Sequence, residues 1–298
     1  MKLTQAKTSK AKRVLIYGES MTGKTTLAGT LAAKYKMIWF DLEKGYESLL
    51  KLPTAAQDNI ELLAIPDTKI FPIAIETLLK VFTGKEVFIC EEHGKVACTV
   101  CTKASKPTTR VCLNELDESY IVVIDSLTQL SASTINFLMK DKEDTAKPEW
   151  EVYRAQGALL EKILSCMQQS KHHIVCISHV VESQQEDGKV KLFPVCGTSN
   201  FSRNCPRFFD DVVYLELKNK KHMASCSTTY ANNITAGSRS GHSIGEDMNL
   251  LSLFQELDMT MPAPAVKPGT LVPVSAKQLA NLNQGQKALS ALASLRNK

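Results

Sequence analysis

The stretch that decides the fold is residues 13–26, which read RVLIYGESMTGKTT. Its first five residues are rich in β-favouring side chains and predict a short strand. Gly18 and Gly23 follow with four residues between them, and a lysine and a threonine come directly after. This is the spacing of a phosphate-binding loop, which needs a strand before it and a helix after it. The residues up to Tyr35 have a helical pattern, so the sequence predicts a nucleotide site here.

The chemistry of this loop suits a nucleoside triphosphate with magnesium. Glycines let backbone N–H groups curl around phosphates at the positive end of the following helix. Lys24 would reach the β- and γ-phosphates, and Thr25 would coordinate Mg²⁺. We therefore predict ATP and Mg²⁺ as cofactors and assign nucleotide contacts to the whole loop: Gly18, Glu19, Ser20, Met21, Thr22, Gly23, Lys24, Thr25 and Thr26.

Apolar strands alternate with helical patterns along the rest of the chain. Continuous apolar strands of this kind are typical of a parallel sheet that is covered on both faces. The sequence therefore predicts an α/β fold with a mostly parallel central sheet flanked by helices. The further strands are expected at 37–41, 60–65, 120–125, 173–179 and 211–217, and further helices at about 72–82 and 150–169.

Polar side chains lie at or just past the ends of three strands, at the edge where parallel α/β sheets bind ligands. Asp125 follows four apolar residues and suits the water shell of Mg²⁺. Glu43 could orient or deprotonate the attacking water, with Asp41 as its nearest rival. His179 could sense the γ-phosphate. For each of these residues an ordinary structural role is the alternative.

The order of these segments resembles RecA-type recombinase ATPases. It is similar in particular to the short, RecA-like single-strand annealing ATPases of bacteriophages, a group also described as phage nucleotide-binding proteins. The resemblance covers about residues 12–257, with 83–118 as an insertion. Only the phosphate loop is specific by itself, and the order and spacing of the other segments add to it. The matching segments are 14–26, 40–45, 122–127, 177–179, 194–197 and 209–215.

The resemblance implies a RecA-like P-loop NTPase core and assigns roles within it. Lys24 and Thr25 would hold ATP and Mg²⁺, and Asp125 would hold the water shell of the metal. Glu43 would be the catalytic carboxylate and His179 the γ-phosphate sensor. These roles are expectations that come from the family and not from spacing alone.

Proteins of this type assemble as rings or filaments and often complete the ATP site with a basic residue of a neighbouring subunit. Arg239 is the candidate for that contact in this chain. The family usually has another basic residue just before it, whereas Gly237 and Ser238 stand here. An ordinary surface arginine is therefore an equally open interpretation.

Two loops in such folds face DNA, and here they would be about 137–149 and 181–206. The charge of the first loop is mixed. The second interleaves basic and aromatic side chains, which suits phosphate contact and base stacking on a single strand. A β-hairpin with core aromatics is the alternative, and we expect Phe208 and Phe209 to lie in the core. The predicted DNA contacts are Lys189, Lys191, Phe201, Arg203 and Arg207.

The nine cysteines favour metal binding or buried thiols over disulfides, because we expect an intracellular protein. Tetrahedral Zn²⁺ accepts three thiolates and one imidazole, and four protein ligands leave no open position for catalysis. We therefore predict a structural zinc site, with Cys112 as an alternative ligand and buried thiols without metal as the other interpretation. The four ligands stand within twelve residues: Cys90, His93, Cys98 and Cys101.

The composition is that of a folded protein without a membrane span. The chain has 298 residues, of which 44% are apolar and 22% charged, and no apolar run approaches 18 residues. Disorder over the whole length is excluded, and we expect a cytoplasmic protein, in the host cytoplasm if it is phage-encoded. The formal charge of +5 arises from basic ends, 1–13 and 262–298, around a body with a charge of −5.

These patterns divide the chain into segments. A basic N-terminal segment, 1–12, precedes an ATPase core over 13–261, and the zinc-binding insertion 83–118 lies within that core. A proline-containing linker and a basic tail follow over 262–298, with a possible terminal helix at 275–298.

The function predicted from these features is that of an ATP-dependent, single-stranded-DNA-binding recombinase or annealing ATPase whose hydrolysis is stimulated by DNA. Its expected partners are single-stranded DNA, further copies of itself, and a single-strand-binding protein or another replication or recombination protein. The alternative is a P-loop ATPase switch or a helicase-loader-like adaptor. A zinc-containing nucleoside kinase is disfavoured, because residues 126–128 offer no acid beside Asp125. Fold alone decides none of these functions.

Overall fold

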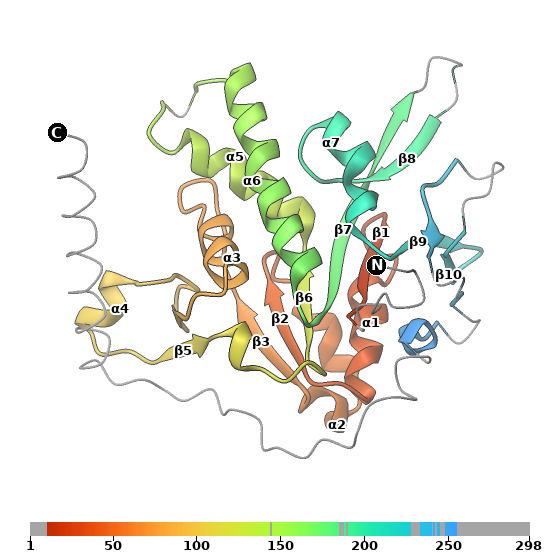
Figure 1. Ribbon diagram of the computed structural model, residues 1–298, viewed down its shortest axis with the longest axis horizontal. Coiled ribbons are helices and arrows are strands. Elements are labelled where there is room, and N and C mark those ends of the chain that lie inside the picture. Colours follow the sequence, from red (N-terminus) through yellow and green to blue (C-terminus); the bar gives the residue numbers. More distant parts are fainter. Residues whose placement is uncertain are drawn as a thin grey trace, which may run out of the picture.

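The computed structural model (Figure 1) describes residues 11–143, 145–184, 188, 190–227, 233–239, 241, 243–244 and 248–254. The predicted N-terminal segment up to residue 10, the tail 262–298 with its predicted helix, and Lys189 lie outside the described residues. Within the described part of the chain, no helix is both long enough and apolar enough to cross a membrane.

Nine strands of the described chain form one central sheet, whose main path runs β10-β9-β1-β7-β6-β2-β3. The six strands from β9 to β3 along this path are parallel, while β8, β10 and β11 pair antiparallel at its margins. This architecture confirms the predicted α/β fold with a mostly parallel sheet. The strands are β1 (Arg13–Gly18), β2 (Met37–Asp41), β3 (Ile60–Ala64), β6 (Ile121–Asp125), β7 (His173–Gln184), β8 (Val190–Pro194), β9 (Asp211–Lys218), β10 (Lys221–Ser225) and β11 (Gly237–Ser238).

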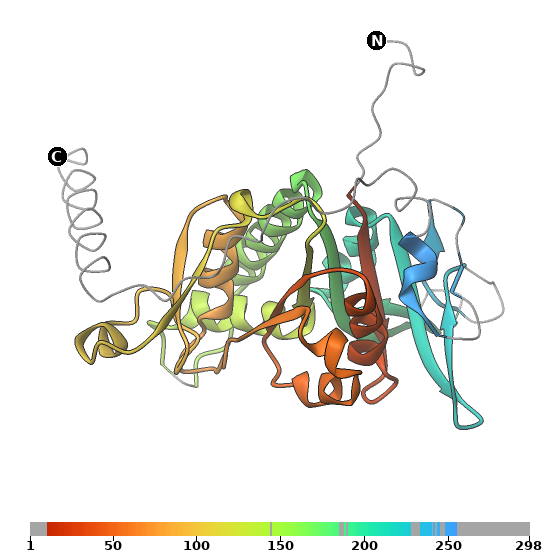
Figure 2. The ribbon, with the colours of Figure 1, turned by 90° about the horizontal axis from the view of Figure 1, so that it is seen from below.

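Helices cover both faces of the sheet (Figures 1 and 2). The larger helices α3, α5 and α6 lie on one face, and α1 lies on the other. The helices of the core are α1 (Lys24–Gly29), α2 (Thr54–Gln57), α3 (Ala74–Phe82), α5 (Leu127–Met139), α6 (Trp150–Gln169) and α7 (Ser199–Asn204). Short 3₁₀ turns are found at Thr30–Ala33, Tyr46–Lys51, Leu113–Glu115, Cys205–Phe208 and Leu250–Phe254.

Alternate residues of each central strand pack against opposite faces. In β1, Leu15 and Tyr17 lie in the core beneath α3, α5 and α6, whereas Val14 and Ile16 pack with the residues of α1. All six residues of β1 are buried. Burial on both faces explains why these strands have continuous apolar sequences without alternation.

The parallel register brings the polar ends of distant segments to one edge of the sheet. Gly18 is opposite His179 in the pairing of β1 with β7, and Asp41 is opposite Asp125 in the pairing of β2 with β6. The carboxyl ends of four strands therefore meet at the edge where the phosphate loop begins.

Two of the predicted segments differ from the structure in a way that bears on the site. The helix after the phosphate loop ends at Gly29 and continues only as a 3₁₀ turn to Ala33, short of Tyr35. Strand β7 runs on to Gln184 and pairs antiparallel with β8. The segment 181–206, predicted as a loop, is therefore mostly a β-hairpin followed by α7, which is the alternative interpretation. Phe208 and Phe209 are buried, as predicted.

The insertion lies beside β3 and has a small sheet of its own (Figure 1). Strands β4 (Val87–Cys90) and β5 (Thr108–Val111) pair antiparallel, with α4 (Thr99–Lys103) between them. The apolar side chains of these strands do not form a separate core. Val87, Ile89 and Val111 pack into the cluster beneath α3, so the insertion is built onto the ATPase core.

Candidate functional site

The two glycines of the phosphate loop are required for different physical reasons. A Cβ atom at Gly18 would lie 2.1 Å from the carbonyl oxygen of Leu215 in β9, so the neighbouring strand leaves no room for a side chain. Gly23 has φ +90°, in the left-handed region that favours glycine. The motif glycines thus allow β9 to approach the loop and allow the loop to turn into α1.

Lys24 is folded back onto its own loop. Its side chain is buried, and Nζ donates to the carbonyl oxygens of Gly18, at 3.0 Å, and Glu19, at 2.6 Å. Burial lowers the pKa of Lys24, and the charges of Asp125 and Glu43 partly oppose that effect. The ammonium group of Lys24 therefore lies inside the phosphate-binding loop, whose backbone N–H groups bind anions. A triphosphate bound in the loop would compensate its positive charge.

Thr25 and Asp125 are joined, as a magnesium site requires. Thr25 Oγ1 donates to Asp125 Oδ2 at 2.9 Å, from the start of α1 to the end of β6. Burial raises the pKa of Asp125 to about 7, the carboxylates of Glu43 and Asp41 add to the rise, and the hydrogen bond from Thr25 opposes it. Hard oxygen donors crowded with negative charge fit Mg²⁺, which would supply a Lewis acid for the phosphate oxygens.

Glu43 is held between two donors. Ser126 Oγ donates to its Oε1, and His179 Nε2 lies 3.2 Å from its Oε2. Burial alone would raise the pKa of Glu43, but the hydrogen bonds from His179 and Ser126 and the charge of Lys24 outweigh burial, so the pKa falls below its usual value. Glu43 is therefore an ionised carboxylate at neutral pH, which a group that orients or deprotonates water must be.

Asp41, the rival for this role, has a different environment. It is 1% exposed, and its Oδ1 accepts the backbone N–H groups of Glu43, at 3.2 Å, and Gly45, at 3.1 Å. Burial raises its pKa against the effect of these bonds. Asp41 thus shapes the turn that presents Glu43.

His179 links the carboxylate to the phosphate loop. With a proton on Nε2 it donates to Glu43, and its Nδ1 lies 3.4 Å from the hydroxyl oxygen of Ser20. Its backbone N–H donates to Thr128 Oγ1 at 2.9 Å. Ser126 and Thr128 could not be recognised as site residues from sequence, because their hydroxyls reach Glu43 and His179 only when β6 lies between β2 and β7.

Arg239 is not near this site within its own chain. It follows β11, which pairs with the first residues of β9, at the amino edge of the sheet. Its guanidinium donates to the carbonyl oxygen of Arg207 at 3.0 Å and lies 3.7 Å from Asp210. The phosphate loop lies at the opposite, carboxyl edge, so contact with ATP would require another copy of the chain.

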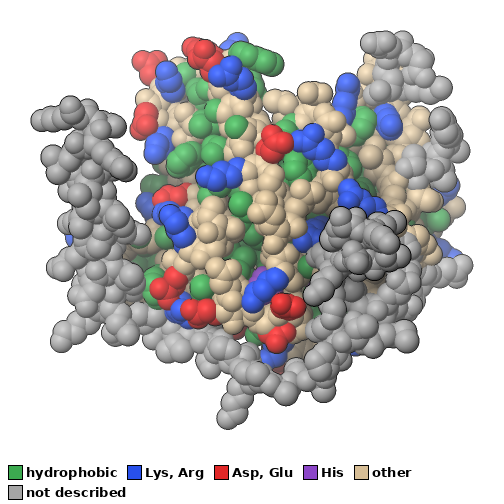
Figure 3. All heavy atoms as spheres, in the orientation of Figure 1, with side chains coloured by type: hydrophobic (Ala, Val, Ile, Leu, Met, Phe, Trp, Pro, Cys, Tyr) green, Lys and Arg blue, Asp and Glu red, His purple; other side chains and the backbone are tan. Residues whose placement is uncertain are grey.

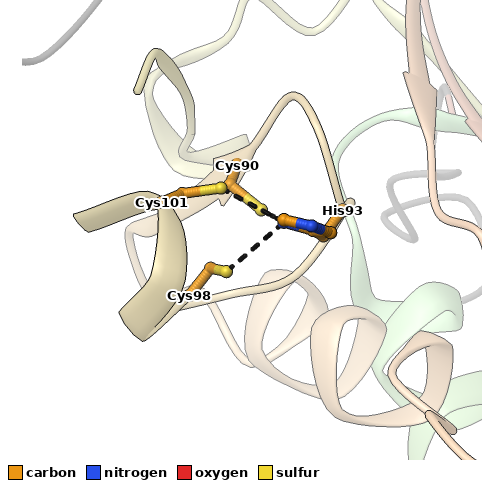
Figure 4. Close-up of side chains that lie close together, drawn as sticks. All are labelled: Cys90, His93, Cys98 and Cys101. Atoms are coloured by element: carbon orange, nitrogen blue, oxygen red, sulfur yellow. Dashed lines mark hydrogen bonds between the residues drawn. The ribbon is translucent and has the colours of Figure 1, made fainter. Parts of the chain in front are cut away.

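The predicted zinc ligands meet in the insertion (Figure 4). His93 Nδ1 lies 3.2 Å from Cys101 Sγ, 3.7 Å from Cys98 Sγ and 3.9 Å from Cys90 Sγ, and all four ligand atoms lie within 4.8 Å of one another. Tetrahedral bonds of about 2.0–2.3 Å to one Zn²⁺ separate sulfur and nitrogen ligands by about 3.5 Å. This set fits a structural zinc ion.

The rest of the insertion supports this assignment. Gly94, with φ +60°, turns so close to the end of β3 that a Cβ atom would lie 2.5 Å from the carbonyl oxygen of Ala64. Cys112, the predicted alternative ligand, is outside the four-residue group and instead hydrogen-bonds to Glu115. The ligand set is therefore the first choice of the sequence prediction, without Cys112.

Of the basic residues predicted to contact DNA, Lys191 lies in β8, Arg203 in α7 and Arg207 in the 3₁₀ turn that follows α7. Figure 3 shows basic side chains on the face of the molecule that carries β8 and α7. We call Lys191, Arg203 and Arg207 the β8–α7 basic surface. Lys191 and Arg203 both lie over the buried ring of Phe193, at 5.5 and 5.9 Å from its centroid. Arg207 is exposed and lies 2.7 Å from Glu161. These contacts fix the cations on the surface without burying them.

Phe201 differs from the other predicted DNA contacts. It is half-buried and packs against the core, with its ring stacked on Phe208 at a centroid distance of 6.4 Å. Its packing favours support of α7 over stacking on a base.

A family model described as an AAA domain matches residues 10–240. The chain belongs to this AAA domain family. It is therefore a P-loop ATPase, and the phosphate loop with Lys24, Thr25 and Asp125 lies within the matched region. No match was found among the curated proteins.

One solved structure that the AAA chain resembles is described as a prototypical ATPase from the type III secretion system of pathogenic bacteria. The identity is 15% and the TM-score 0.38, over 69% of this chain and 52% of the other. The AAA chain thus spans about half the length of that ATPase.

Proposed function

We propose that this AAA ATPase is a single-stranded-DNA-binding recombinase or annealing ATPase of phage type, in which DNA stimulates ATP hydrolysis. Strand β7 is the observation that supports the proposal most. It places His179 beside Glu43 and continues to Gln184 within the hairpin that it forms with β8. Because His179 and the hairpin belong to the same strand, a shift of His179 at the γ-phosphate can be transmitted along β7 to the hairpin.

The β8–α7 basic surface is the DNA contact in this proposal. Arg203 Nη2 donates to Ser183 Oγ at 2.6 Å, so the surface is tied to the far part of β7. Arg203 and Arg207 are exposed and Lys191 is half-buried. Cations held on the surface in this way suit phosphate oxygens, which give affinity without sequence preference. DNA bound there would bias the position of β7 and, with it, the contact between His179 and Glu43.

Several copies of the chain would assemble into a ring or filament. Arg239 lies at the sheet edge opposite the phosphate loop of its own chain, so it can reach an ATP only in another copy. In such an assembly Arg239 of one copy would face the nucleotide of the next. A single-strand-binding protein or another replication or recombination protein is the further partner that this role calls for.

The test is ATP turnover measured with and without single-stranded DNA, for the wild type, Lys24→Ala and Lys191→Ala/Arg203→Ala. We expect DNA to stimulate the wild type and Lys24→Ala to abolish turnover. The double variant should keep its basal rate and lose the stimulation. Lys36→Ala/Lys51→Ala, which removes the same charge elsewhere, is the matched control and should respond to DNA as the wild type does.

Two outcomes would favour the other functions. Phosphorylation of a nucleoside without any effect of DNA would overturn the proposal in favour of a kinase. An adaptor or switch would be favoured by two results together. ATP hydrolysis would not change when single-stranded DNA is added, and the Glu43→Gln variant would still load its partner protein.

A further inference from the structure

The hairpin of β9 and β10 returns to the phosphate loop from the side opposite Glu43. Gly18, the last residue of β1, pairs with Leu215, so residues 216–218 of β9 extend beyond it. Asn219 and Lys220 form a tight turn, with φ of 50° and 62°, and β10 then runs back along β9. Figure 2 shows this hairpin projecting past the carboxyl end of β1.

His222 of β10 is in direct contact with the loop. Its Nδ1 lies 2.8 Å from the carbonyl oxygen of Thr22, so Nδ1 carries the proton and donates. Its ring also stands over Gly23, because a Cβ atom there would lie 3.4 Å from Nδ1 and 3.5 Å from Cε1. An imidazole ring therefore flanks the turn that leads into α1.

Leu217 lies beside this ring. It is paired with His222 across the hairpin, so both side chains point to the same face, the one toward the phosphate loop. Leu217 is 55% exposed, although it is a large apolar side chain next to a polar loop. Met223 is on the opposite face of the hairpin, paired with Glu216. Leu217 and His222 thus form a small exposed surface, partly apolar, on the face of the hairpin toward the phosphate loop.

The order of strands fixes the direction in which ATP lies. The residues assigned to the γ-phosphate lie at or just past the carboxyl ends of strands on one side of β1: Glu43 after β2, Asp125 in β6 and His179 in β7. Strands β9 and β10 are on the other side of β1. A triphosphate that extends along this edge with its γ end toward β7 and β6 has its nucleoside end on the side of β1 where the hairpin lies.

We propose that His222 and Leu217 form the subsite for the adenine ring of ATP. A flat aromatic base gains contact area on an imidazole and an exposed leucine, while the phosphates are held by the loop. The inference deepens the ATP site of the AAA core and rests only on nucleotide binding. It is independent of DNA binding, so either proposal can fail without the other.

The test compares the affinities of ATP and of inorganic tripolyphosphate, each with Mg²⁺, by titration calorimetry. Tripolyphosphate has the three phosphates and no base. Leu217→Ala should weaken ATP binding about tenfold, because apolar contact with the base is lost, and should change tripolyphosphate binding by less than about twofold. Met223→Ala, on the opposite face, is the matched control and should change neither.

Two substitutions separate the ring of His222 from its hydrogen bond. His222→Asn keeps a donor for the Thr22 carbonyl and removes the ring, so it should weaken ATP about tenfold and spare tripolyphosphate. His222→Phe keeps a flat ring without the donor and should retain the preference for ATP. Equal weakening of both ligands in Leu217→Ala and His222→Asn would show that the hairpin only braces the loop, and would overturn the proposal. Unchanged ATP affinity in both variants would overturn it as well.

Discussion

Three carboxylates meet at the end of the sheet, and their surroundings give them different tasks. Asp41 is buried beneath the turn it shapes, and Asp125 is buried with a raised pKa beside Thr25. Glu43 has a lowered pKa, because His179 and Ser126 donate to it. We therefore test Glu43 as the group that orients or deprotonates the attacking water.

Glu43→Gln is therefore expected to lower the turnover of ATP by about 100-fold or more, the range for loss of a general base. ATP affinity should stay within about twofold, since Lys24 and Thr25 hold the nucleotide. Steady-state kinetics and nucleotide titration measure the two quantities. Glu47→Gln, an exposed residue of the same loop region, is the control. Normal turnover in Glu43→Gln would remove Glu43 from the mechanism.

Residues were predictable from the sequence where their role depends on neighbours along the chain. The phosphate loop and the acids at strand ends are of this kind, because their spacing to a strand or helix is local. Ser126 meets Glu43 across 83 residues, and His222 meets Thr22 across 200. No spacing rule covers such pairs, which depend on the order of strands in the sheet.

Among the elements, α5 shows the same limit. Four of its thirteen residues are serine or threonine, which have weak helix propensity and blur the apolar period. In the fold, Ser133 and Thr134 are fully buried, and Ser133 Oγ donates to Asp67. Tertiary contacts therefore stabilise α5, although its local sequence does not predict a helix. The strands at 121–125 and 173–179 were predictable, because each contains a continuous run of at least four apolar residues.

The part of the insertion around α4 has few apolar contacts of its own beyond Cys90, Cys98 and Cys101. A bound metal ion would hold this part together by cross-linking its ligands. We expect about one zinc ion per chain in the purified protein, and its loss in Cys98→Ser/Cys101→Ser, because two of four ligands are removed. Cys112→Ser is the control and should keep the metal, since Cys112 lies outside the ligand group. Elemental analysis decides the matter, and native protein without metal would contradict the assignment.

A buried histidine joins the insertion to the start of β7. His172 Nε2 lies 2.7 Å from the carbonyl oxygen of Leu113. Burial lowers the pKa of His172 below its usual value, and the charge of Lys171 lowers it further, while the bond to Leu113 opposes the fall. The unfolded chain therefore binds a proton more readily than the folded chain does.

It follows that the contribution of His172 to stability is present above about pH 6.5 and is lost as the pH falls. His172→Gln cannot titrate, so its free energy of unfolding should fall less steeply between pH 7 and pH 5 than that of the wild type. Urea unfolding at a series of pH values measures both slopes. Identical slopes would mean that His172 is not the titrating group.

At the scale of the whole molecule, charge and catalysis are separated along the chain. The ends carry the excess of basic residues, and the ATPase body is acidic. Deleting 262–298 should weaken binding to single-stranded DNA and reduce its dependence on salt, because fewer phosphate charges are neutralised. Basal ATP hydrolysis should persist, since no residue of the candidate ATP site is removed. Unchanged salt dependence in a filter-binding titration would exclude the tail as a DNA contact.

The position of Arg239 has a consequence for how the protein must be assayed. The arginine lies at one edge of the sheet and the phosphate loop at the other. In the proposed assembly Arg239 of each copy would contact the ATP of a neighbouring copy, and the ATP of each copy would be contacted by Arg239 of another. An isolated copy would then be an incomplete catalyst, and the rate per chain would climb with protein concentration until assembly is complete. Dilution alone would act as an inhibitor.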